Sequence, residues 1–273
     1  YIVYAGETYA YTVAKAYYIT VSGSFTAAKN DTIKVTLTYA GAGWDGTTKT
    51  APTQDESGVY LIGTAAELAW FADAVNKGNT TINGKLTANI NLNGKAWTAI
   101  GTQAHPFSGT FYGNGHTLTG LTVNTGANGY AGLFGKLDTV SVVKNVKFDK
   151  AVIQTANYYA GVVAAWTLGD IINCHVTNST VSNTGQTGAG GIAAIANNVK
   201  DCSVTTSNII GAFGYAAGVS GQVNGTISNC YAVNVSIKAG GVAATYPSGG
   251  VVGSLFKGKA VNCYFSGTLD GRY

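Results

Sequence analysis

A dipeptide recurs along the C-terminal part of the chain: Asn173-Cys174, Asp201-Cys202, Asn229-Cys230 and Asn262-Cys263. The copies follow one another at spacings of 28, 28 and 33, and Asn145-Val146 precedes the first at the same spacing of 28 as a copy without cysteine. A fixed period of this size indicates a repeat architecture, in which each repeat packs on its neighbours along one axis.

Each copy lies in the same pattern of apolar residues. The residue three before the cysteine is Ile171, Val199, Ile227 or Ala260. The residue two after it is Val176, Val204, Ala232 or Phe265. Apolar residues at these short spacings, in short β-branched runs, favour strands over helices. The residue before the cysteine is always Asn or Asp, which tolerate a positive φ, so we expect a tight bend between two strands at each copy.

The repeat length predicts the fold class. A unit of about 28 residues with three short strands is one coil of a parallel β-helix, in which neighbouring coils lie about 4.8 Å apart. We therefore predict an all-β protein built on a parallel β-helix of five to six coils. The usual chirality of parallel crossovers makes it right-handed.

The segments before the repeats predict four parts of the chain. Residues 1–50 alternate polar and apolar side chains and form a small β segment, and residues 51–58 read as a linker. Residues 59–84 hold a strand and one helix, for which Thr64 and Glu67 form a capping box and Gly78 marks the end. Residues 85–273 form the β-helix, and we expect the helix to cover its first coil.

Four further stretches resemble the entry of the β-helix in bacterial surface proteins that carry GLUG-type repeats: Ile62-Gly63-Thr64-Ala65-Ala66-Glu67-Leu68, Asn89-Ile90-Asn91-Leu92, Trp97-Thr98-Ala99-Ile100-Gly101-Thr102 and Phe107-Ser108-Gly109-Thr110-Phe111-Tyr112-Gly113-Asn114-Gly115-His116. The resemblance covers about residues 59–269 and implies the same fold. The copies drift, with Ala164 and Ala194 where the motif has its second glycine. Repeats of this type occur in adhesins, surface-layer-associated proteins and secreted enzymes alike, so the resemblance implies no single activity.

The amino-acid composition limits the classes of partner and the cellular locations that we expect. Charged residues make up 10% of the chain, and the net charge of +4 comes from scattered lysines. Nucleic-acid binding normally requires a clustered basic face, so we expect no nucleic-acid partner. No apolar stretch approaches the roughly 18 residues that a membrane span needs. Low charge with abundant Gly, Thr and Asn, and a first residue, Tyr1, that is not Met, predict a secreted or cell-surface protein whose signal peptide has been removed.

The cysteines leave two interpretations open. At one position on successive coils, their Cα atoms should lie about 5 Å apart, which is within disulfide reach. The four side chains can form a buried column of thiols, in which cysteine serves as a small apolar residue. Alternatively at least one disulfide forms, and Cys174 with Cys202 is the best pair. A metal site is the least favoured, because stacked thiols without histidines cannot surround an ion tetrahedrally.

Catalytic residues are hard to nominate from the sequence. Hydrolysis of glycosides requires two carboxyl groups about 5–9.5 Å apart, and the acids of the β-helix share no face at one-coil spacing. The three histidines share no register, and no Gly-x-Ser-x-Gly motif occurs. We therefore predict no catalytic site, no metal site and no cofactor.

Self-assembly is the function that the sequence favours. A C-terminal coil without a cap and a Tyr-rich N-terminal segment with strand edges could join by strand addition between copies, and head-to-tail joining gives a filament. The candidate assembly residues are Tyr9, Tyr11, Tyr17, Tyr18, Ile19, Val21, Phe265 and Leu269. Residues 1–50 could instead fold back or form an independent module, or the chain could be a fragment of a longer one.

Glycan binding is the second candidate function. Tyr231 and Tyr264 each follow a cysteine of the repeat, so they should share one face if their coils are adjacent, and tyrosine rings can stack on sugars. A monomeric adhesin would bind through this pair. Tyrosine is also simply common on β surfaces. A polysaccharide lyase or hydrolase is the third and least favoured candidate.

Overall fold

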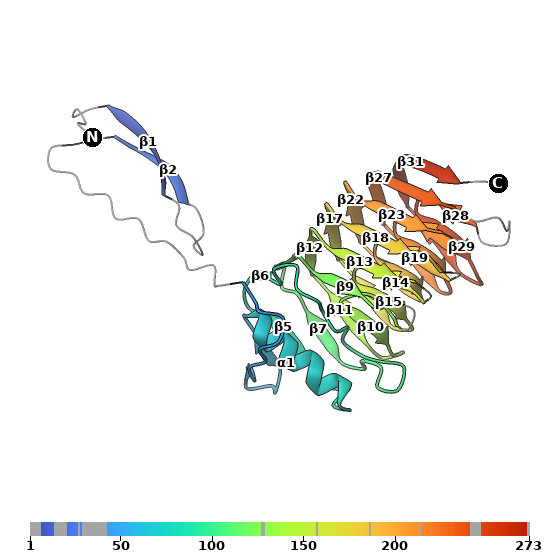
Figure 1. Cartoon of the computed structure of the whole chain (residues 1–273), viewed down its shortest axis with the longest axis horizontal. Helices are drawn as coiled ribbons and strands as arrows, with labels where there is room; N and C mark the ends of the chain where they lie inside the picture. The colour runs from blue at the N-terminus through green and yellow to red at the C-terminus, as the bar shows by residue number, and fades with distance from the viewer. Residues whose placement is uncertain are drawn as a thin grey trace. The chain divides into compact units, whose positions relative to one another are not determined.

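A computed structural model describes residues 7–13, 21–26, 28, 43–126, 129–156, 158–185, 187–212, 214–240 and 247–271. The chain divides into two compact units, Tyr1–Trp44 and Asp45–Tyr273. In the first unit, β1 (Thr8–Val13) and β2 (Val21–Thr26) pair as an antiparallel hairpin (Figure 1). Residues 1–6, 14–20, 27 and 29–42 of the predicted N-terminal β segment lie outside the described residues.

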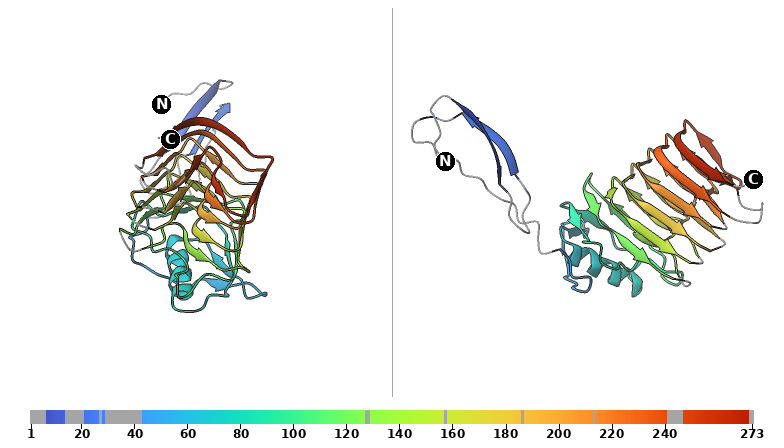
Figure 2. Two further views of the ribbon diagram at one scale, coloured as in Figure 1. Left: turned by 90° about the vertical axis from the view of Figure 1, so that its right-hand side faces the viewer. Right: turned by 45° about the horizontal axis from the view of Figure 1, so that its top comes forward.

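The second unit is a parallel β-helix, and the predicted fold class is confirmed (Figures 1 and 2). One sheet contains β3 (Thr53–Gln54), β4 (Tyr60–Ile62), β5 (Gly84–Leu86), β7 (Thr110–Tyr112), β11 (Val142–Lys144), β16 (Asp170–Ile172), β21 (Asn198–Lys200), β26 (Thr226–Ser228) and β30 (Lys259–Val261). A shorter sheet contains β10 (Phe134–Leu137), β15 (Ala164–Thr167), β20 (Ala193–Ala196), β25 (Ser220–Val223) and β29 (Val252–Leu255).

Two more sheets complete each coil. The larger contains β6 (Ile90–Asn91), β8 (Thr117–Thr119), β12 (Lys147–Asp149), β17 (His175–Thr177), β22 (Ser203–Thr205), β27 (Tyr231–Ala239), β23 (Asn208–Gly211), β18 (Thr180–Asn183), β13 (Val152–Thr155) and β9 (Thr122–Asn124), with β31 (Tyr264–Gly271) beside β27. The smaller contains β14 (Ala160–Gly161), β19 (Gly188–Gly190), β24 (Tyr215–Ala217) and β28 (Ser248–Gly249). A middle coil therefore has five short strands rather than three.

The coil count from the sequence is too low. Seven parallel strands from β5 to β30 follow one another in the first sheet, so the β-helix has about seven coils rather than five to six. A count based on the cysteine positions misses the early coils, because these coils contain no cysteine and differ in length. Gly84 pairs with Phe111 and Thr110 with Val142, so the spacings across these two coils are 27 and 32.

The helix α1 (Ala65–Asn76) forms where the sequence predicts it. Thr64 Oγ1 accepts the amide of Glu67, and the Glu67 carboxylate accepts the amide of Thr64, so both halves of the capping box are present. Phe71 is fully buried and its ring centroid lies 6.0 Å from that of Phe107 and 5.9 Å from that of Phe111. The apolar side of α1 thus covers the interior of the first coils.

The expected linker at residues 51–58 is part of the β-helix unit. It contains β3, which pairs with β4 in antiparallel orientation. The amide of Thr50 donates to the carbonyl of Ala66 at the start of α1, with an N···O distance of 3.1 Å. The boundary between the two units therefore falls at residue 44 and not in the Pro-containing segment.

The bends that the sequence predicts are present at every copy. Their residues all have φ between 50° and 60°: Asn145, Asn173, Asp201, Asn229 and Asn262. A second column of left-handed residues, which we did not predict, follows five positions later on four coils: Lys150, Asn178, Thr206 and Asn234. The two columns turn the chain twice in each of these coils and keep the strands of the larger sheet in register from coil to coil.

Candidate functional site

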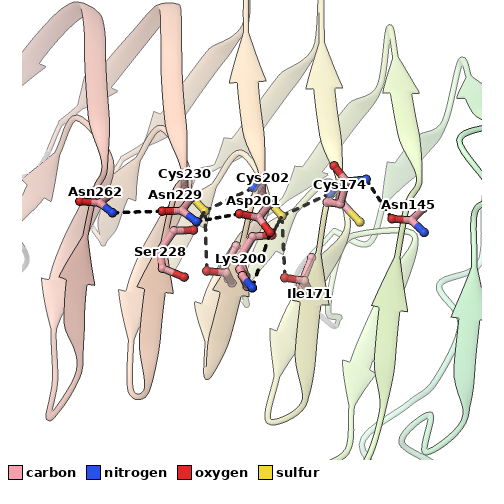
Figure 3. A network of polar contacts seen from close by, with 12 residues as sticks. Asn145, Ile171, Cys174, Lys200, Asp201, Cys202, Ser228, Asn229, Cys230 and Asn262 are labelled. Atoms are coloured by element: carbon pink, nitrogen blue, oxygen red, sulfur yellow. Dashed lines mark hydrogen bonds and ion pairs between the residues drawn. The ribbon is translucent and has the colours of Figure 1, made fainter.

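Side-chain amides connect the first column of bends along the axis of the β-helix. Asn173 Nδ2 donates to Asn145 Oδ1 at 2.9 Å, and Asn229 Nδ2 donates to Asp201 Oδ1 at 2.9 Å (Figure 3). Asn262 Nδ2 continues the series to Asn229 Oδ1 at 3.3 Å. Asn173, Asn229 and Asn262 thus each donate to the coil before them, so these side chains connect neighbouring coils.

The series is interrupted at Asp201. A carboxylate has no N–H to donate, so Asp201 cannot bond to Asn173 of the preceding coil. Asn173 Oδ1 instead forms a hydrogen bond of 2.8 Å with His175 Nε2. His175 Nδ1 lies 2.8 Å from Ser203 Oγ on the next coil.

The cysteines form the buried column of thiols beside these bends. All four are free thiols, and the first three are buried. Cys174 N–H donates to Cys202 Sγ at 3.3 Å, and Cys202 N–H donates to Cys230 Sγ at 3.4 Å. The sulfur is therefore an acceptor for the bend amide of the preceding coil as well as an apolar side chain. Burial raises the pKa of the Cys202 thiol well above its ordinary value, which makes it a poor nucleophile.

Serine occupies the same place at the second column of bends. Ser179 Oγ accepts the amide of Ala151 at 3.0 Å, and Ser207 Oγ accepts the amide of Ser179 at 3.1 Å. Both hydroxyls donate to carbonyls within their own coil, those of Thr177 and Thr205. Small side chains that donate to a carbonyl of their own coil and accept an amide of the preceding coil are thus used at both bends.

The contact between His175 and Ser203 does not make a reactive serine. Burial, and secondarily Lys147, lower the pKa of His175, so its ring is neutral near pH 7. A neutral imidazole could accept a proton, yet Ser203 lies on a continuous strand with only 4% of its surface exposed. A nucleophile must reach its substrate. Sequence reasoning missed this pair, because the two residues are 28 positions apart.

The acidic side chains are dispersed over separate hydrogen bonds. Asp138 accepts from Ser108, Asp149 from Asn178 and Asp170 from Asn198. Among the described residues, no group of three or more His, Cys, Asp or Glu side chains could hold a metal ion. No helix in the described part of the chain is long and apolar enough to cross a membrane.

The last coil exposes positions that every middle coil buries. Ile237 is fully buried, whereas Leu269, its partner on β31, is 41% exposed. Val223 is likewise fully buried, whereas Leu255, its partner on β29, is 48% exposed. Within the described residues β31 pairs only with β27, so its other edge offers unpaired backbone groups. We call this surface the open coil; its exposed large apolar residues are Leu255, Phe256, Val261, Tyr264 and Leu269.

The candidate assembly residues fall partly on this surface. Leu269 and Phe265 lie on β31, as expected. Leu255, Phe256 and Val261 were missed. Leu255 could have been found from its register with the buried Val223, whereas Val261 pairs with the half-buried Ser228. In the N-terminal unit, Tyr9 and Tyr11 lie on β1 and Val21 begins β2. The other three, Tyr17, Tyr18 and Ile19, lie outside the described residues.

The candidate glycan contacts lie on adjacent coils. Tyr231 on β27 pairs in register with Tyr264 on β31, and the two residues are 42% and 59% exposed. The expected shared face is confirmed by this register.

Comparisons with known proteins bear on the fold more than on the function. No family model matches the chain. A solved structure described as "a putative immunoglobulin A1 protease from Bacteroides ovatus" is similar with a TM-score of 0.60 and 23% identity, over 79% of this chain and 77% of that one. At this identity the likeness shows the fold alone.

Two curated relatives match short regions. A "Putative Gly-rich membrane protein" of Evansella cellulosilytica is 31% identical over 122 residues, 43% of this chain and 14% of the relative. A "Halomucin" of Haloquadratum walsbyi is 34% identical over 77 residues, 28% of this chain and 1% of the relative. The chain thus spans a small part of the length of both.

Proposed function

We propose that the chain is a non-catalytic structural part of a secreted or cell-surface protein and that it self-assembles by strand addition at the open coil. The observation that carries the proposal is the exposure of Leu255 and Leu269, whose partners one coil earlier are fully buried. An added strand would bury this apolar surface and pair the edge of β31.

The N-terminal hairpin of a second copy is the occupant that we propose. In the described part of this unit, β1 and β2 form a two-stranded antiparallel sheet. A two-stranded hairpin is marginally stable in water and gains from a sheet to extend. Head-to-tail addition of this kind does not close and gives a filament.

The non-catalytic part of the proposal rests on the side chains of the β-helix. Its acids are engaged in separate hydrogen bonds, Ser203 is buried, and the Cys202 thiol has a raised pKa. The location rests on composition, on the resemblance to GLUG-type repeats and on the name of the membrane protein relative.

Negative-stain electron microscopy tests the proposal. We would compare the full chain with a version lacking residues 1–44, which removes the hairpin unit but keeps the contacts of Lys49 and Thr50 with α1. Filaments from the full chain alone are the expected result. Single particles from both versions at all concentrations would contradict it.

Glycan binding by Tyr231 and Tyr264 is a second candidate, supported by their register on adjacent coils. Tyr264 belongs to the open coil, so this binding would compete with assembly. A monomeric chain that loses glycan binding when both tyrosines become alanine would favour this candidate over the first.

A further inference from the structure

Four aromatic side chains gather on two adjacent coils of the β-helix, far along the chain from the open coil. Tyr130 is their centre: its ring centroid lies 5.6 Å from that of Tyr158, 5.9 Å from that of Tyr159 and 6.2 Å from that of Trp166. The rings of Tyr159 and Trp166 meet edge to face at 5.6 Å. Register explains the gathering, because Ala131 pairs with Ala160 and thereby sets Tyr130 beside Tyr159.

Polar groups border this aromatic cluster. Lys136 on β10 pairs in register with Trp166 on β15, and its Nζ lies 4.9 Å from the centroid of the indole ring. Gln103 Oε1 accepts hydrogen bonds of 3.0 Å from Lys136 Nζ and from Tyr130 Oη. Burial, and then its neighbours Tyr159 and Tyr158, raise the pKa of Tyr130, which keeps its hydroxyl a donor. The cluster therefore combines ring surfaces with an ordered polar border.

The charge of Lys136 is not neutralised by a carboxylate in the described part of the chain, where the ion pairs involve Lys49, Lys77 and Lys200. The indole N–H of Trp166 is a second unsatisfied group: it is buried and has no hydrogen-bond partner among the described residues. A native protein seldom leaves such a donor unpaired without a reason. A ligand that carries negative charge would neutralise Lys136.

We propose that the cluster formed by Tyr130, Tyr158, Tyr159 and Trp166, with Lys136 and Gln103, binds an acidic glycan. The C–H face of a pyranose ring packs on the electron-rich face of an aromatic ring, which is the contact that tyrosine and tryptophan offer best. The carboxylate of a uronic acid then pairs with Lys136 in a charge-assisted hydrogen bond. Gln103 fixes the lysine and orients the sugar hydroxyls.

This site is separate from the open coil. The cluster lies on β10, β15 and the segments before them, whereas the open coil begins three strands further along the same sheet, at β29. Glycan binding here would leave the edge of β31 free. The two activities can therefore be lost independently.

Affinity electrophoresis of the full chain in gels containing polygalacturonate tests the site, with dextran as the neutral comparison. We expect retardation by polygalacturonate that weakens as salt rises, and little retardation by dextran. Tyr159→Ala should weaken binding by about tenfold or more, because it removes a ring that contacts both Tyr130 and Trp166. Lys136→Gln should reduce binding to polygalacturonate to the level of dextran.

The chain offers a matched control. Lys144 Nζ lies 4.8 Å from the ring centroid of Tyr112, which is the same kind of pair on β11 and β7, and no further ring of the described residues contacts Tyr112. Lys144→Gln makes the same change in net charge as Lys136→Gln, and we expect it to leave binding unchanged. Equal losses in the two variants would overturn the site, as would no retardation of the wild-type chain or equal retardation by dextran. Melting temperatures of the variants check that each one is folded.

Discussion

At the residue scale, the column of bend amides shows that a single side-chain nitrogen decides whether a hydrogen bond forms between two coils. Asn and Asp both take the left-handed conformation, with φ of 50° at Asn173 and 56° at Asp201. Only Asn can also donate to the coil before it, so Asp201 accepts from Asn229 but does not donate to Asn173. At Asn173 Oδ1, His175 Nε2 forms the hydrogen bond that an amide at position 201 would otherwise donate.

Asp201→Asn should therefore stabilise the protein. The new amide keeps the oxygen that accepts from Asn229 and adds a donor toward Asn173 Oδ1, while the long 3.9 Å ion pair with Lys200 is lost at little cost. We expect the free energy of unfolding to rise by about 0.5–1.5 kcal/mol, measured by urea denaturation. Asn229→Asp, the reverse change at the next coil, should destabilise. A fall in stability for Asp201→Asn would contradict the account.

His175 should make stability depend on pH. Its pKa is lowered in the folded protein, by burial first and then by Lys147, from 6.5. Below that value the unfolded chain takes up a proton that the folded chain resists, so the free energy of unfolding falls as the pH drops. We expect His175→Gln to lose less stability than the wild type between about pH 7.5 and pH 5.5, measured by urea denaturation. His116→Gln controls for the loss of a histidine as such, and equal slopes for both variants would argue against the assignment.

Some of these residues could be predicted from the sequence and others could not. The first column of bends could be found because Asn or Asp precedes each cysteine at fixed spacing. The second column could not, because Lys150 and Thr206 are not typical left-handed residues and only the geometry of the coil holds them at φ of 55° and 48°. The aromatic cluster was out of reach for a related reason: its members are brought together by register, and Tyr130 and Trp166 are 36 positions apart.

At the scale of elements, α1 could be predicted well because its signals are local. The capping box, the apolar stripe and the terminating glycine all lie between Thr64 and Gly78. The prediction of a linker at residues 51–58 was wrong for the opposite reason. Its Pro and acidic residues are typical of loops, and the pairing of β3 with β4 depends on the neighbouring sheet rather than on the two residues of β3 themselves.

Glu67→Ala should destabilise the covered end of the β-helix. Its carboxylate accepts from the amides of Gly63 and Thr64 and from Thr64 Oγ1, at 2.8, 2.9 and 3.0 Å. Losing this half of the capping box should lower the free energy of unfolding by about 0.5–2 kcal/mol, measured by urea denaturation. Glu56→Ala, in the exposed turn between β3 and β4, removes the same charge and should have no measurable effect. Equal losses would mean that charge and not the cap is responsible.

At the scale of the whole β-helix, the two ends of the described stack differ. The first coils are covered by α1, whose Phe71 fills their interior, while the last coil leaves Leu255 and Leu269 exposed. Figure 2 shows the two ends of the β-helix at opposite sides of the stack. The difference between a covered and an open end is what gives the proposed assembly a direction.

Leu269→Lys should abolish assembly while the chain stays folded. Lysine on an edge strand is a common means of preventing strand addition, because adding a strand would bury its charge. Thr268→Lys is the matched control, since its side chain points to the outer face, like that of its partner Ser236, and not toward the interior like that of Ile237. We expect sedimentation velocity to show large species for the wild type and Thr268→Lys, and monomers for Leu269→Lys. Persistence of large species in Leu269→Lys would exclude the open coil as the joining surface.

The constant register between coils also has a consequence for evolution. Because Val142, Asp170, Asn198 and Thr226 follow one another at a constant spacing of 28, excising or duplicating one such interval joins equivalent positions and leaves every bend and buried column intact. Unequal recombination can therefore lengthen or shorten the gene in whole coils, each of which changes the reach of the rod by about 4.8 Å. The bends fix the length of each coil, and natural selection can therefore adjust the length of the β-helix one coil at a time.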